Sequence, residues 1–352
     1  MDKTTDILII GQGIGGTMLG WFARQSGLSY KIYDKGALKS ASVVSSGIIN
    51  PVTGHRFVKS WLVDDLIKEA DRSYREIGSY LGKKVITTYP IWRHIPDIQA
   101  ENIWSSRCMD PAYDAYLSVP EEGQLSKIDF EDFHAWGVVR GGSVVDTSAL
   151  IRLMRERWIT QGVLKEEEFD HAELEVGPEG FIYESEKYKA VILAGGMRDI
   201  DNLWFKTDVY RPAKGDAIIC EIPDLYPDKV IKYKKFIVPF GGDKYWIGSN
   251  YQHDFDDHQP DAQSRSELED WLKSGIGSRY EILDHVSGIR AATKYRRPLI
   301  GEHRSVRGLF LMNGLGTKGI SLAPYFARKI IASIASGSQL KETSSFEKAF
   351  HV

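Results

Sequence analysis

The sequence contains little cysteine and no excess of charge of either sign. Cys108 and Cys220 are its only cysteines. Two thiols so far apart exclude a disulfide scaffold and a cysteine zinc site, so we expect two reduced thiols. Lysine and arginine total 45 against 48 aspartates and glutamates, a formal net charge of −3. Proteins that bind nucleic acids or anionic membranes usually carry a basic surplus, so we expect neither partner.

Long hydrophobic runs are also missing. The apolar run at residues 7–10 is interrupted at once by glycine-rich sequence, which makes it too short to cross a bilayer. Lys3 is outnumbered by Asp2 and Asp6, whereas a secretory signal begins with net positive charge. We interpret residues 7–10 as a buried strand that enters a tight turn, and we expect a cytoplasmic protein.

What is present is typical of a globular chain. Apolar residues make up 42% and charged residues 26% of the sequence. At about 150 residues per domain, 352 residues predict two domains, or one large domain with an insertion.

The first chemical motif is Gly11-Gln12-Gly13-Ile14-Gly15-Gly16. Gly11 permits a sharp exit from the strand, Gly13 lets a diphosphate approach the backbone, and Gly16 lets a following helix pack closely. The amides at the start of that helix, which we expect to end near Gly27, attract the diphosphate. The motif therefore predicts dinucleotide binding.

A second predicted strand, residues 30–33, supports this interpretation. It ends in Asp34, 18 residues past Gly16, where an acidic side chain accepts hydrogen bonds from an adenosine ribose. An acid at this position disfavours a 2′-phosphate, which leaves FAD or NAD.

Three later segments favour FAD. The small-residue stretch 40–51 offers hydroxyls and amides for a diphosphate and a second ring system, and its Ile48-Ile49 indicates burial. Two more strands end in glycine, at 189–196 and 308–320. The second leads into a predicted helix from about Leu322 to Ala335, with Pro324 in its first turn, where proline is tolerated.

These motifs occur in the order seen in the FAD-dependent D-amino-acid oxidase/glycine oxidase family: GQGIGG, SSGIINP, VILAGG, and GIRAATKYRRPLIG with NGLGTKGISLAP. The chain resembles this family from about Asp6 to Ser336. Within the family they look most like the oxidase module of bifunctional tRNA wobble-uridine modification proteins, although no methyltransferase half is apparent. The resemblance implies an α/β protein with a Rossmann-like FAD-binding domain and an inserted antiparallel-sheet substrate domain. Sarcosine oxidases tether flavin through a cysteine near the position of Arg290, and none occurs there, so non-covalent FAD is expected.

The expected domains are discontinuous. Residues 1–60, 142–210 and 288–336 form the FAD-binding domain, residues 61–141 and 211–287 the substrate domain, and residues 337–352 a C-terminal tail.

Local patterns add further elements. Apolar periodicity predicts a helix within 61–81, and Asp146 is expected to cap a helix over 149–158. Residues 89–133 are interpreted as irregular, and glycines at 241–242 predict a hairpin between strands.

The motifs and the resemblance together assign the following residues to FAD binding: Gly11, Gly13, Ile14, Gly15, Gly16, Asp34, Lys35, Ser42, Ser45, Ser46, Gly47, Ile48, Phe169, Ala194, Gly195, Gly196, Gly314, Gly316, Thr317, Lys318, Gly319 and Ile320. Lys318 either faces the N1–C2 carbonyl edge of the flavin or is an exposed loop lysine. His55 either reaches the flavin or substrate or is structural. We expect no metal site.

Arg290 matches the arginine that holds the substrate carboxylate in glycine oxidases; its alternative role is an ion pair with a buried acid. Tyr251 is a candidate pocket wall, whereas Trp246 is more simply a core residue. A second carboxylate-binding arginine of glycine oxidases appears here as Thr317, which makes a bulkier secondary amine with a carboxymethyl group as suitable a substrate as a free amino acid.

Two functions follow. In the first, the protein oxidises a C–N bond of an amino acid or secondary amine by hydride transfer to flavin N5, with oxygen or another electron acceptor restoring the cofactor. In the second, it binds FAD or NAD without amine chemistry. The resemblance also implies a tRNA-modification-related oxidase as an alternative. The oligomeric state stays open.

Overall fold

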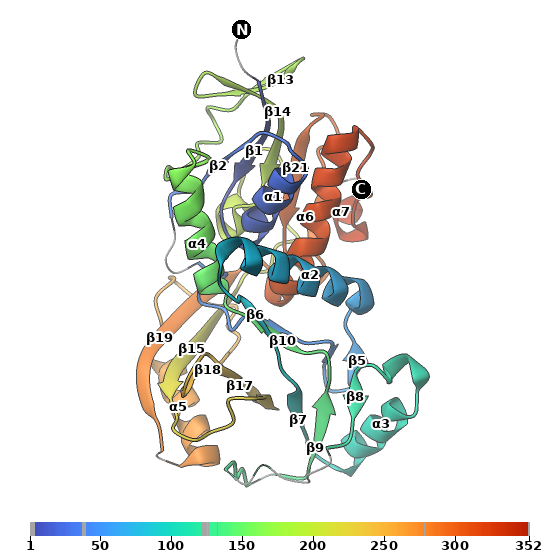
Figure 1. Ribbon diagram of the computed structural model, residues 1–352, viewed down its shortest axis with the longest axis vertical. Helices are drawn as coiled ribbons and strands as arrows, with labels where there is room; N and C mark the ends of the chain where they lie inside the picture. The colour runs from blue at the N-terminus through green and yellow to red at the C-terminus, as the bar shows by residue number, and fades with distance from the viewer. Residues whose placement is uncertain are drawn as a thin grey trace.

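The computed structural model describes residues 4–36, 40–120, 125, 127–131, 133–277 and 279–350. The outermost residues of the expected first segment and of the tail, 1–3 and 351–352, lie outside this range. Figure 1 shows two parts stacked along the long axis, each organised around a sheet. Among the described helices, none is both long enough and apolar enough for a bilayer span.

The upper part in Figure 1 contains a mixed sheet whose centre is parallel. Strand β1 lies between β2 and β14 and pairs in parallel with both. Strand β11 extends the sheet beyond β2, and β21 runs parallel to the end of β14. Antiparallel β13, β12 and β20 complete it. The bounds are β1 Thr5–Ile10, β2 Tyr30–Tyr33, β11 Leu164–Lys165, β12 Glu175–Gly177, β13 Gly180–Tyr183, β14 Glu186–Leu193, β20 Leu299–Glu302 and β21 Leu309–Asn313.

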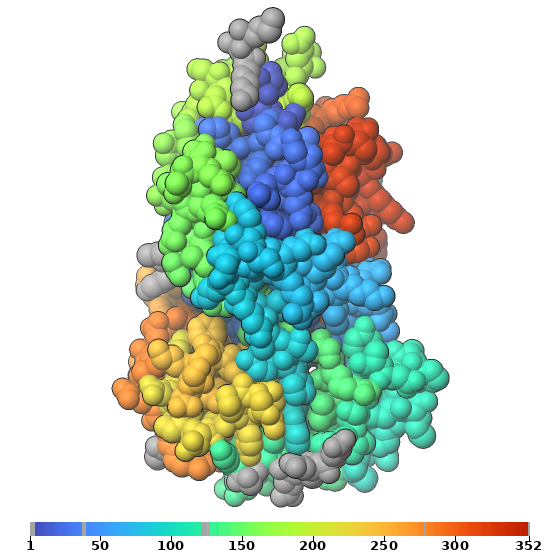
Figure 2. Space-filling model, viewed as in Figure 1, coloured from blue at the N-terminus to red at the C-terminus, as the bar shows by residue number. Residues whose placement is uncertain are grey.

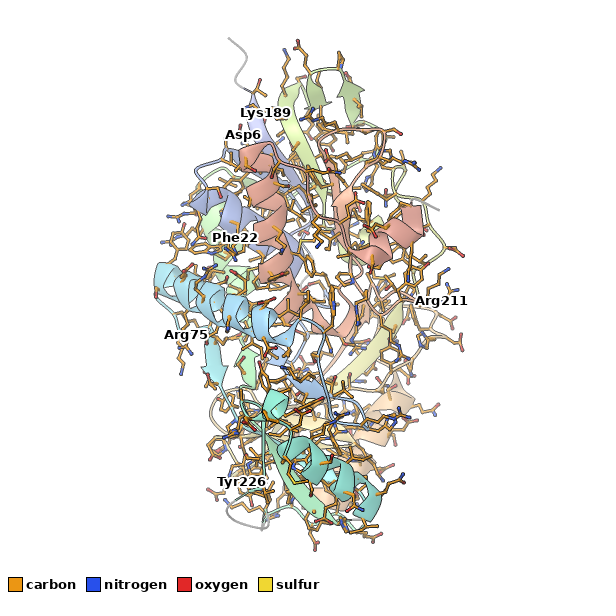
Figure 3. The ribbon with its side chains drawn as sticks, turned by 90° about the vertical axis from the view of Figure 1, so that its right-hand side faces the viewer. Asp6, Phe22, Arg75, Lys189, Arg211 and Tyr226 are labelled. Atoms are coloured by element: carbon orange, nitrogen blue, oxygen red, sulfur yellow. The ribbon has the colours of Figure 1, made fainter. Side chains whose placement is uncertain are left out.

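Segments from both ends and the middle of the chain meet in this part. Figure 2 shows the blue N-terminal segment between a green segment and the red C-terminal helices. At the top edge, Lys189 of β14 forms an ion pair with Asp6 of β1 at 2.7 Å, and Figure 3 shows the two residues close together. The sheet of the upper part is therefore assembled from segments that are far apart in the sequence.

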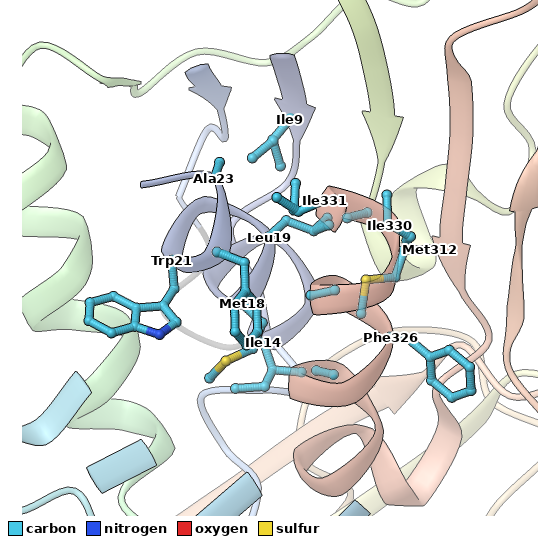
Figure 4. Close-up of a cluster of buried hydrophobic side chains, with 14 of the residues drawn as sticks. Ile9, Ile14, Met18, Leu19, Trp21, Ala23, Met312, Phe326, Ile330 and Ile331 are labelled. Carbon is cyan, nitrogen blue, oxygen red and sulfur yellow. The ribbon is translucent and has the colours of Figure 1, made fainter. Parts of the chain in front are cut away.

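One face of the sheet is covered by helices α1, α2, α4 and α6, and short α7 lies beside β20. Their bounds are α1 Ile14–Gln25, α2 Val63–Leu81, α4 Thr147–Thr160, α6 Gly319–Ser336 and α7 Ser344–Phe350. Figure 4 shows side chains of α1 and α6 facing one another, and all of them are buried. Because each fully buried large aliphatic side chain contributes about 1.5–3 kcal/mol, this contact holds the two helices together.

Helix α6 begins three residues earlier than predicted, at Gly319, so Pro324 lies in its second turn and not its first. A proline there cannot donate to the carbonyl of Ile320. The hydroxyl of Tyr74, on α2, donates to that carbonyl instead, at 2.7 Å. The buried tyrosine therefore satisfies the acceptor that the proline leaves open.

The lower part contains a second sheet, with strand order β19-β15-β18-β17-β16-β7-β9-β8. Neighbours are antiparallel except β16 and β7, which are parallel. One face packs on α5, Ala262–Ile276, and the other faces the upper part. The bounds are β7 Ile91–Ile95, β8 Leu117–Ser118, β9 Ala135–Val139, β15 Ala213–Glu221, β16 Val230–Tyr233, β17 Lys235–Pro239, β18 Lys244–Gly248 and β19 Glu281–Arg290.

Short strands and turns connect the two parts. Strand β10 lies between β3 and β6, and β4 forms a hairpin with β5. The bounds are β3 Ile48–Ile49, β4 Val52–Thr53, β5 Val58–Lys59, β6 Ile86–Thr88 and β10 Ser143–Val145, with 3-10 turns at Pro111–Tyr113, Gly196–Asp199 and Gly316–Lys318.

Several predicted elements are confirmed: α2, the α4 helix with Asp146 accepting from the Ala149 amide at 3.0 Å, and the β17–β18 hairpin. The irregular interpretation of 89–133 is wrong. This stretch holds β7 and helix α3, Ile98–Cys108. Its prolines lie between these elements and do not interrupt them, which is why proline content misled the prediction.

Helix α2 makes its main contacts with α6 and buries its apolar side chains in the upper core. The expected boundaries placed this stretch in the substrate domain. The domain limits themselves stay a prediction, but α2 packs with the upper part.

Candidate functional site

The glycine turn after β1 is shaped by close backbone contacts. Gly11 has φ 93°, and a Cβ there would lie 2.7 Å from the Cα of Gly195, at the end of β14. A Cβ on Gly16 would lie 1.8 Å from the carbonyl oxygen of Gly11. Only glycine therefore allows two strand ends and the start of α1 to meet here.

The start of α1 has the properties of an anion site. Gly13 caps the helix without a side-chain hydrogen bond, and its first turn contains no acidic residue. The Ile14 amide donates to the hydroxyl of Ser42 at 3.1 Å, and Gly15 meets only ordinary contacts. The first-turn amides and the helix dipole thus suit a diphosphate.

The serine-rich stretch lies against this helix start and against α4. Ser45 is 3.2 Å from the hydroxyl of Thr147 and also donates to the Ser42 carbonyl, while Ser46 is buried. Gly47 has φ 68°, and a Cβ there would lie 1.8 Å from the carbonyl oxygen of Val145. Ile48 begins β3, so the stretch turns from the helix start toward the second sheet.

Asp34 is fixed by several hydrogen bonds. Its carboxylate accepts from the amides of Gln12, at 2.9 Å, and Gly36, at 2.8 Å. Arg155 of α4 donates to it at 2.8 Å and to its backbone carbonyl at 2.7 Å. Sequence reasoning missed Arg155, because only helical periodicity marks its position. The acid is therefore neutralised by the protein and held at the end of β2, where a ribose is expected.

A cavity of about 620 Å³ opens beside Asp34. Five of the residues assigned to FAD line it: Gly11, Asp34, Lys35, Phe169 and Gly195. Lys35 forms an ion pair with Glu168 at its rim. The structure thus brings together residues that are far apart in sequence around a space suited to an adenosine.

The ends of β14 and β21 form the next part of the site. Asn313 donates to the carbonyl of Gly196 at 2.9 Å, which joins the segments after Ala194 and before Gly314. Gly314 has φ 68°, and a Cβ there would lie 2.7 Å from the methyl group of Thr293. The chain then turns at Gly316 into α6.

The start of α6 lies beside the start of α1: a Cβ on Gly319 would be 3.5 Å from the Ile14 side chain. Two helix N-termini therefore converge at one edge of the sheet. Ile320 lies in the same turn and is buried, while Thr317 is exposed. This convergence provides a second source of positive potential beside the predicted flavin position.

Lys318 is half-buried, unlike an exposed loop lysine, and its ammonium donates to the Ser60 hydroxyl at 2.8 Å. Burial lowers its pKa, and the nearby Arg297 cation lowers it further. Arg297 itself lies over the ring of Trp61 at 4.8 Å. Two cations therefore lie close together near the start of α6, and the contact of Lys318 with a flavin stays a prediction.

Arg290 ends β19, and its guanidinium lies directly against Gly215 of β15, where a Cβ would be 2.4 Å from both terminal nitrogens. Its Nη2 donates to the Ser249 hydroxyl at 2.8 Å, and its Cζ is 5.7 Å from the ring of Tyr251. Its buried Nη1 has no hydrogen-bond partner. Burial lowers the Arg290 pKa, while Tyr251 and Asp216 act in the opposite direction. The alternative role for Arg290 is an ion pair with a buried acid. Among the described residues, no ion pair joins Arg290 to an acid.

The remaining candidates lie apart. Trp246 is buried in the core between the two parts and donates to the Val44 carbonyl at 3.0 Å. Tyr251 is 52% exposed, which leaves its ring available beside Arg290. His55 is exposed on the β4–β5 hairpin. In the described part of the chain, no group of three or more histidine, cysteine or acidic side chains could hold a metal ion.

Comparison with known proteins identifies the family and the fold. A family model described as FAD dependent oxidoreductase, DAO, matches residues 6–333. The structure is similar to glycine oxidase from Geobacillus kaustophilus, with a TM-score of 0.81, 19% identity and coverage of 97% of this chain and 98% of that chain. It is also similar to iminodiacetate oxidase from Chelativorans sp. BNC1, with a TM-score of 0.78, 17% identity and coverage of 95% and 96%. L-proline dehydrogenase from P. horikoshii gives a TM-score of 0.68 at 16% identity, covering 99% and 96%. At these identities the likeness to solved structures shows the fold.

Proposed function

The chain belongs to the DAO family of FAD-dependent oxidoreductases, and on this premise we propose that it oxidises a C–N bond of a secondary amine that carries a carboxymethyl group. The chemistry that FAD supplies when bound is acceptance of a hydride at N5. The residues of this chain bind and orient the amine and stabilise the negative charge that arrives on the cofactor.

The observation that carries the proposal is the unpaired Nη1 of Arg290. A buried guanidinium nitrogen without an acceptor is costly, and a carboxylate is the acceptor that matches its planar geometry. Ser249 holds the other nitrogen, so the guanidinium is oriented before a ligand arrives. Tyr251 lies beside it and provides an apolar wall for the carbon atoms next to the carboxylate.

A secondary amine is favoured over a free amino acid because Arg290 has no cationic neighbour at Thr317, which is exposed and neutral. Two of the similar structures bear on this choice, since one is named for glycine and the other for iminodiacetate. The resemblance to the oxidase module of tRNA wobble-uridine modification proteins is compatible with a larger carboxymethylamine. The net charge of −3 argues against tRNA itself as the bound partner.

The cofactor residues of the proposal are those that surround the 620 Å³ cavity and the two helix starts. We place the adenosine beside Asp34 and Phe169, the diphosphate at the start of α1, and the flavin between the serine-rich stretch and Lys318. No cysteine lies beside Arg290, so the binding is non-covalent.

The test is anaerobic mixing of the FAD-loaded protein with pairs of amines that differ only in the carboxylate, such as N-ethylglycine and N-ethylmethylamine. We expect the carboxylated member to bleach the flavin and the other to leave it oxidised. Arg290→Met should slow the bleaching about 100-fold, because it removes one partner of a buried charge pair. Repeating the reaction in air and measuring peroxide identifies oxygen or another compound as the acceptor.

Arg211→Met is the matched control, since Arg211 is exposed and its hydrogen bonds within the described part of the chain go to backbone carbonyls; Figure 3 shows it at the surface. It should react as the unmodified protein does. Equal bleaching rates for the Arg290 variant and the control, or bleaching by both members of a pair, would contradict the proposal.

A further inference from the structure

Two more cations occupy the sheet face that carries Arg290. Lys232 of β16 is directly opposite Arg93 of β7 in the parallel register, and opposite Phe236 of β17 on its other side. The neighbours of Lys232 along its strand, Ile231 and Tyr233, pack in the α5 core. Because side chains alternate along a strand, Lys232 and Arg93 lie on the opposite face, toward the upper part.

The same alternation places Arg290 on this face. Gly215 lies beneath its guanidinium, and Ala217, two residues further along β15, belongs to the core cluster between the two parts. Ala217 is paired with Gly248, and Gly248 with Phe236, so one row of partners crosses the sheet from β15 to Lys232. The Arg93–Lys232 pair and Arg290 thus face the same side.

Neither cation of the pair has an acidic partner among the described residues. Arg93 donates weakly to the Gly54 carbonyl at 3.5 Å and lies 5.6 Å from the ring of Phe57. Lys232 bonds the Lys234 carbonyl, and its ammonium is 4.2 Å from the ring of Phe236. Both side chains are half-buried.

This arrangement is unfavourable as it stands. Burial lowers the pKa of Lys232 to about 7, with the cations of Arg93 and Lys235 adding to the effect, and burial lowers the pKa of Arg93. Two other shielded cations have carboxylate partners: Arg155 has Asp34, and Lys214 has Asp257. Two adjacent cations without one are typical of a site whose anion comes from a ligand.

We propose that Arg93 and Lys232 bind an oxyanion, a carboxylate or a phosphate, at the far end of the substrate whose first carboxylate Arg290 holds. The identity of that molecule rests on the proposed function. The Arg290 guanidinium lies over β15, which is three strand spacings from β16, or roughly 14 Å at about 4.8 Å per strand. The substrate class is therefore an extended amine with an anionic group at each end, and glycine is too small to reach both.

The first test measures anion binding directly. Inorganic phosphate is titrated into the FAD-loaded protein by calorimetry, and succinate is used in parallel to distinguish carboxylate from phosphate recognition. We expect at least tenfold weaker binding by Lys232→Met and by Arg93→Met, and retention by Lys232→Arg. Lys244→Met is the control, because Lys244 is exposed on the same sheet outside the pair.

Thermal unfolding at pH 6 separates binding from a structural role. Without added anion, the Tm of Lys232→Met should be about 2 °C higher than that of the unmodified protein, since the substitution removes a half-buried cation that destabilises the folded state. Phosphate should raise the Tm of the unmodified protein and leave the variant unchanged. A lower Tm for the variant together with unaltered anion binding would show a structural lysine and overturn the inference.

A kinetic measurement then ties the pair to the substrate. N-carboxymethyl amines with and without a distal carboxylate or phosphate are compared. The distal group should lower KM at least tenfold in the unmodified protein and in the exposed Lys244→Met control, but not in Lys232→Met. If no amine is oxidised, the proposed function fails, yet the phosphate titration still decides the anion site. If amines react but phosphate binds equally to all variants, only the anion site is overturned.

Discussion

The nucleotide-binding end and the substrate face of the molecule differ in whether their charged side chains have partners of opposite charge. At the nucleotide end, Asp34 and Arg155 neutralise each other at 2.8 Å, so the expected contacts of FAD there are with backbone amides and a shaped cavity. On the substrate face, Arg290, Arg93 and Lys232 have no carboxylate partner among the described residues. At the nucleotide end the protein supplies both the cation and the anion. On the substrate face it supplies the cations, and we expect the ligand to supply the anion.

This difference has a consequence for stability. A satisfied ion pair can be kept without a ligand, whereas unpaired half-buried cations raise the free energy of the folded chain until an anion arrives. The nucleotide end is thus expected to be ordered by its own contacts. The substrate face is expected to gain stability from its ligand.

The largest effect should come from Gly16→Ala, which tests whether the nucleotide end depends on backbone contact. The new methyl carbon would lie 1.8 Å from the Gly11 carbonyl oxygen, so α1 must move away from β1. We expect a loss of at least about 3 kcal/mol in the free energy of unfolding and a colourless protein that FAD does not restore. Denaturant unfolding and the visible spectrum measure both.

Gly15→Ala is the control for this change. Its methyl carbon would meet neighbours at 3.8 Å, which is ordinary contact, so this variant should fold normally. If Gly16→Ala also folded and bound FAD as the unmodified chain does, close backbone approach would not be what defines this end.

Local sequence patterns predict the nucleotide end better than they predict the substrate face. The turn from β1 through α1 to β2 is continuous in the chain, so glycine spacing and Asp34 predicted it from local rules. The Arg93–Lys232 pair depends on the register between β7 and β16, strands far apart in sequence. No local pattern encodes that register, and both residues look like ordinary charges of a strand. Arg155 was missed for the same reason, because its partner lies on another element.

Arg290 and Lys318 fall between these cases. Family resemblance drew attention to both, but the facts that support a role are structural: an unpaired nitrogen in one, a neighbouring cation and a half-buried ammonium in the other. The sequence did not predict helix α3, because prolines flank it. The predicted start of α6 lies three residues after the observed one, because Tyr74 compensates for Pro324 and allows an earlier start.

An intermediate effect is expected at Lys318, where the two ends of the site meet. If its cation, with that of Arg297, stabilises negative charge on the reduced cofactor, Lys318→Met should lower the reduction potential of bound flavin. About 30 mV is expected, which is tenfold in a two-electron equilibrium. Because burial and Arg297 lower the Lys318 pKa, reduction should also raise that pKa and take up part of a proton.

Spectroelectrochemistry with a reference dye measures the potential, and Lys329→Met, on the outer side of the same helix, is the control. An unchanged potential in Lys318→Met would mean that its bond to Ser60 is structural and that the charge at this position comes from the start of α6 alone.

The smallest effect is expected from Arg155→Met, which removes the nearer of two counter-charges of Asp34 and leaves Arg198 at 3.7 Å. The amides of Gln12 and Gly36 still hold the Asp34 carboxylate, so the ribose position should persist with less restraint. We expect FAD to dissociate about fivefold more readily, or about 1 kcal/mol, measured by flavin fluorescence on dilution. Arg152→Met is the control, since Arg152 lies on α4 and its ion pair, among the residues that the structure describes, is with exposed Glu156. A hundredfold loss of affinity would place Arg155 in direct contact with the cofactor, and the nucleotide end would then resemble the substrate face, with a cation that serves the ligand more than its neighbour.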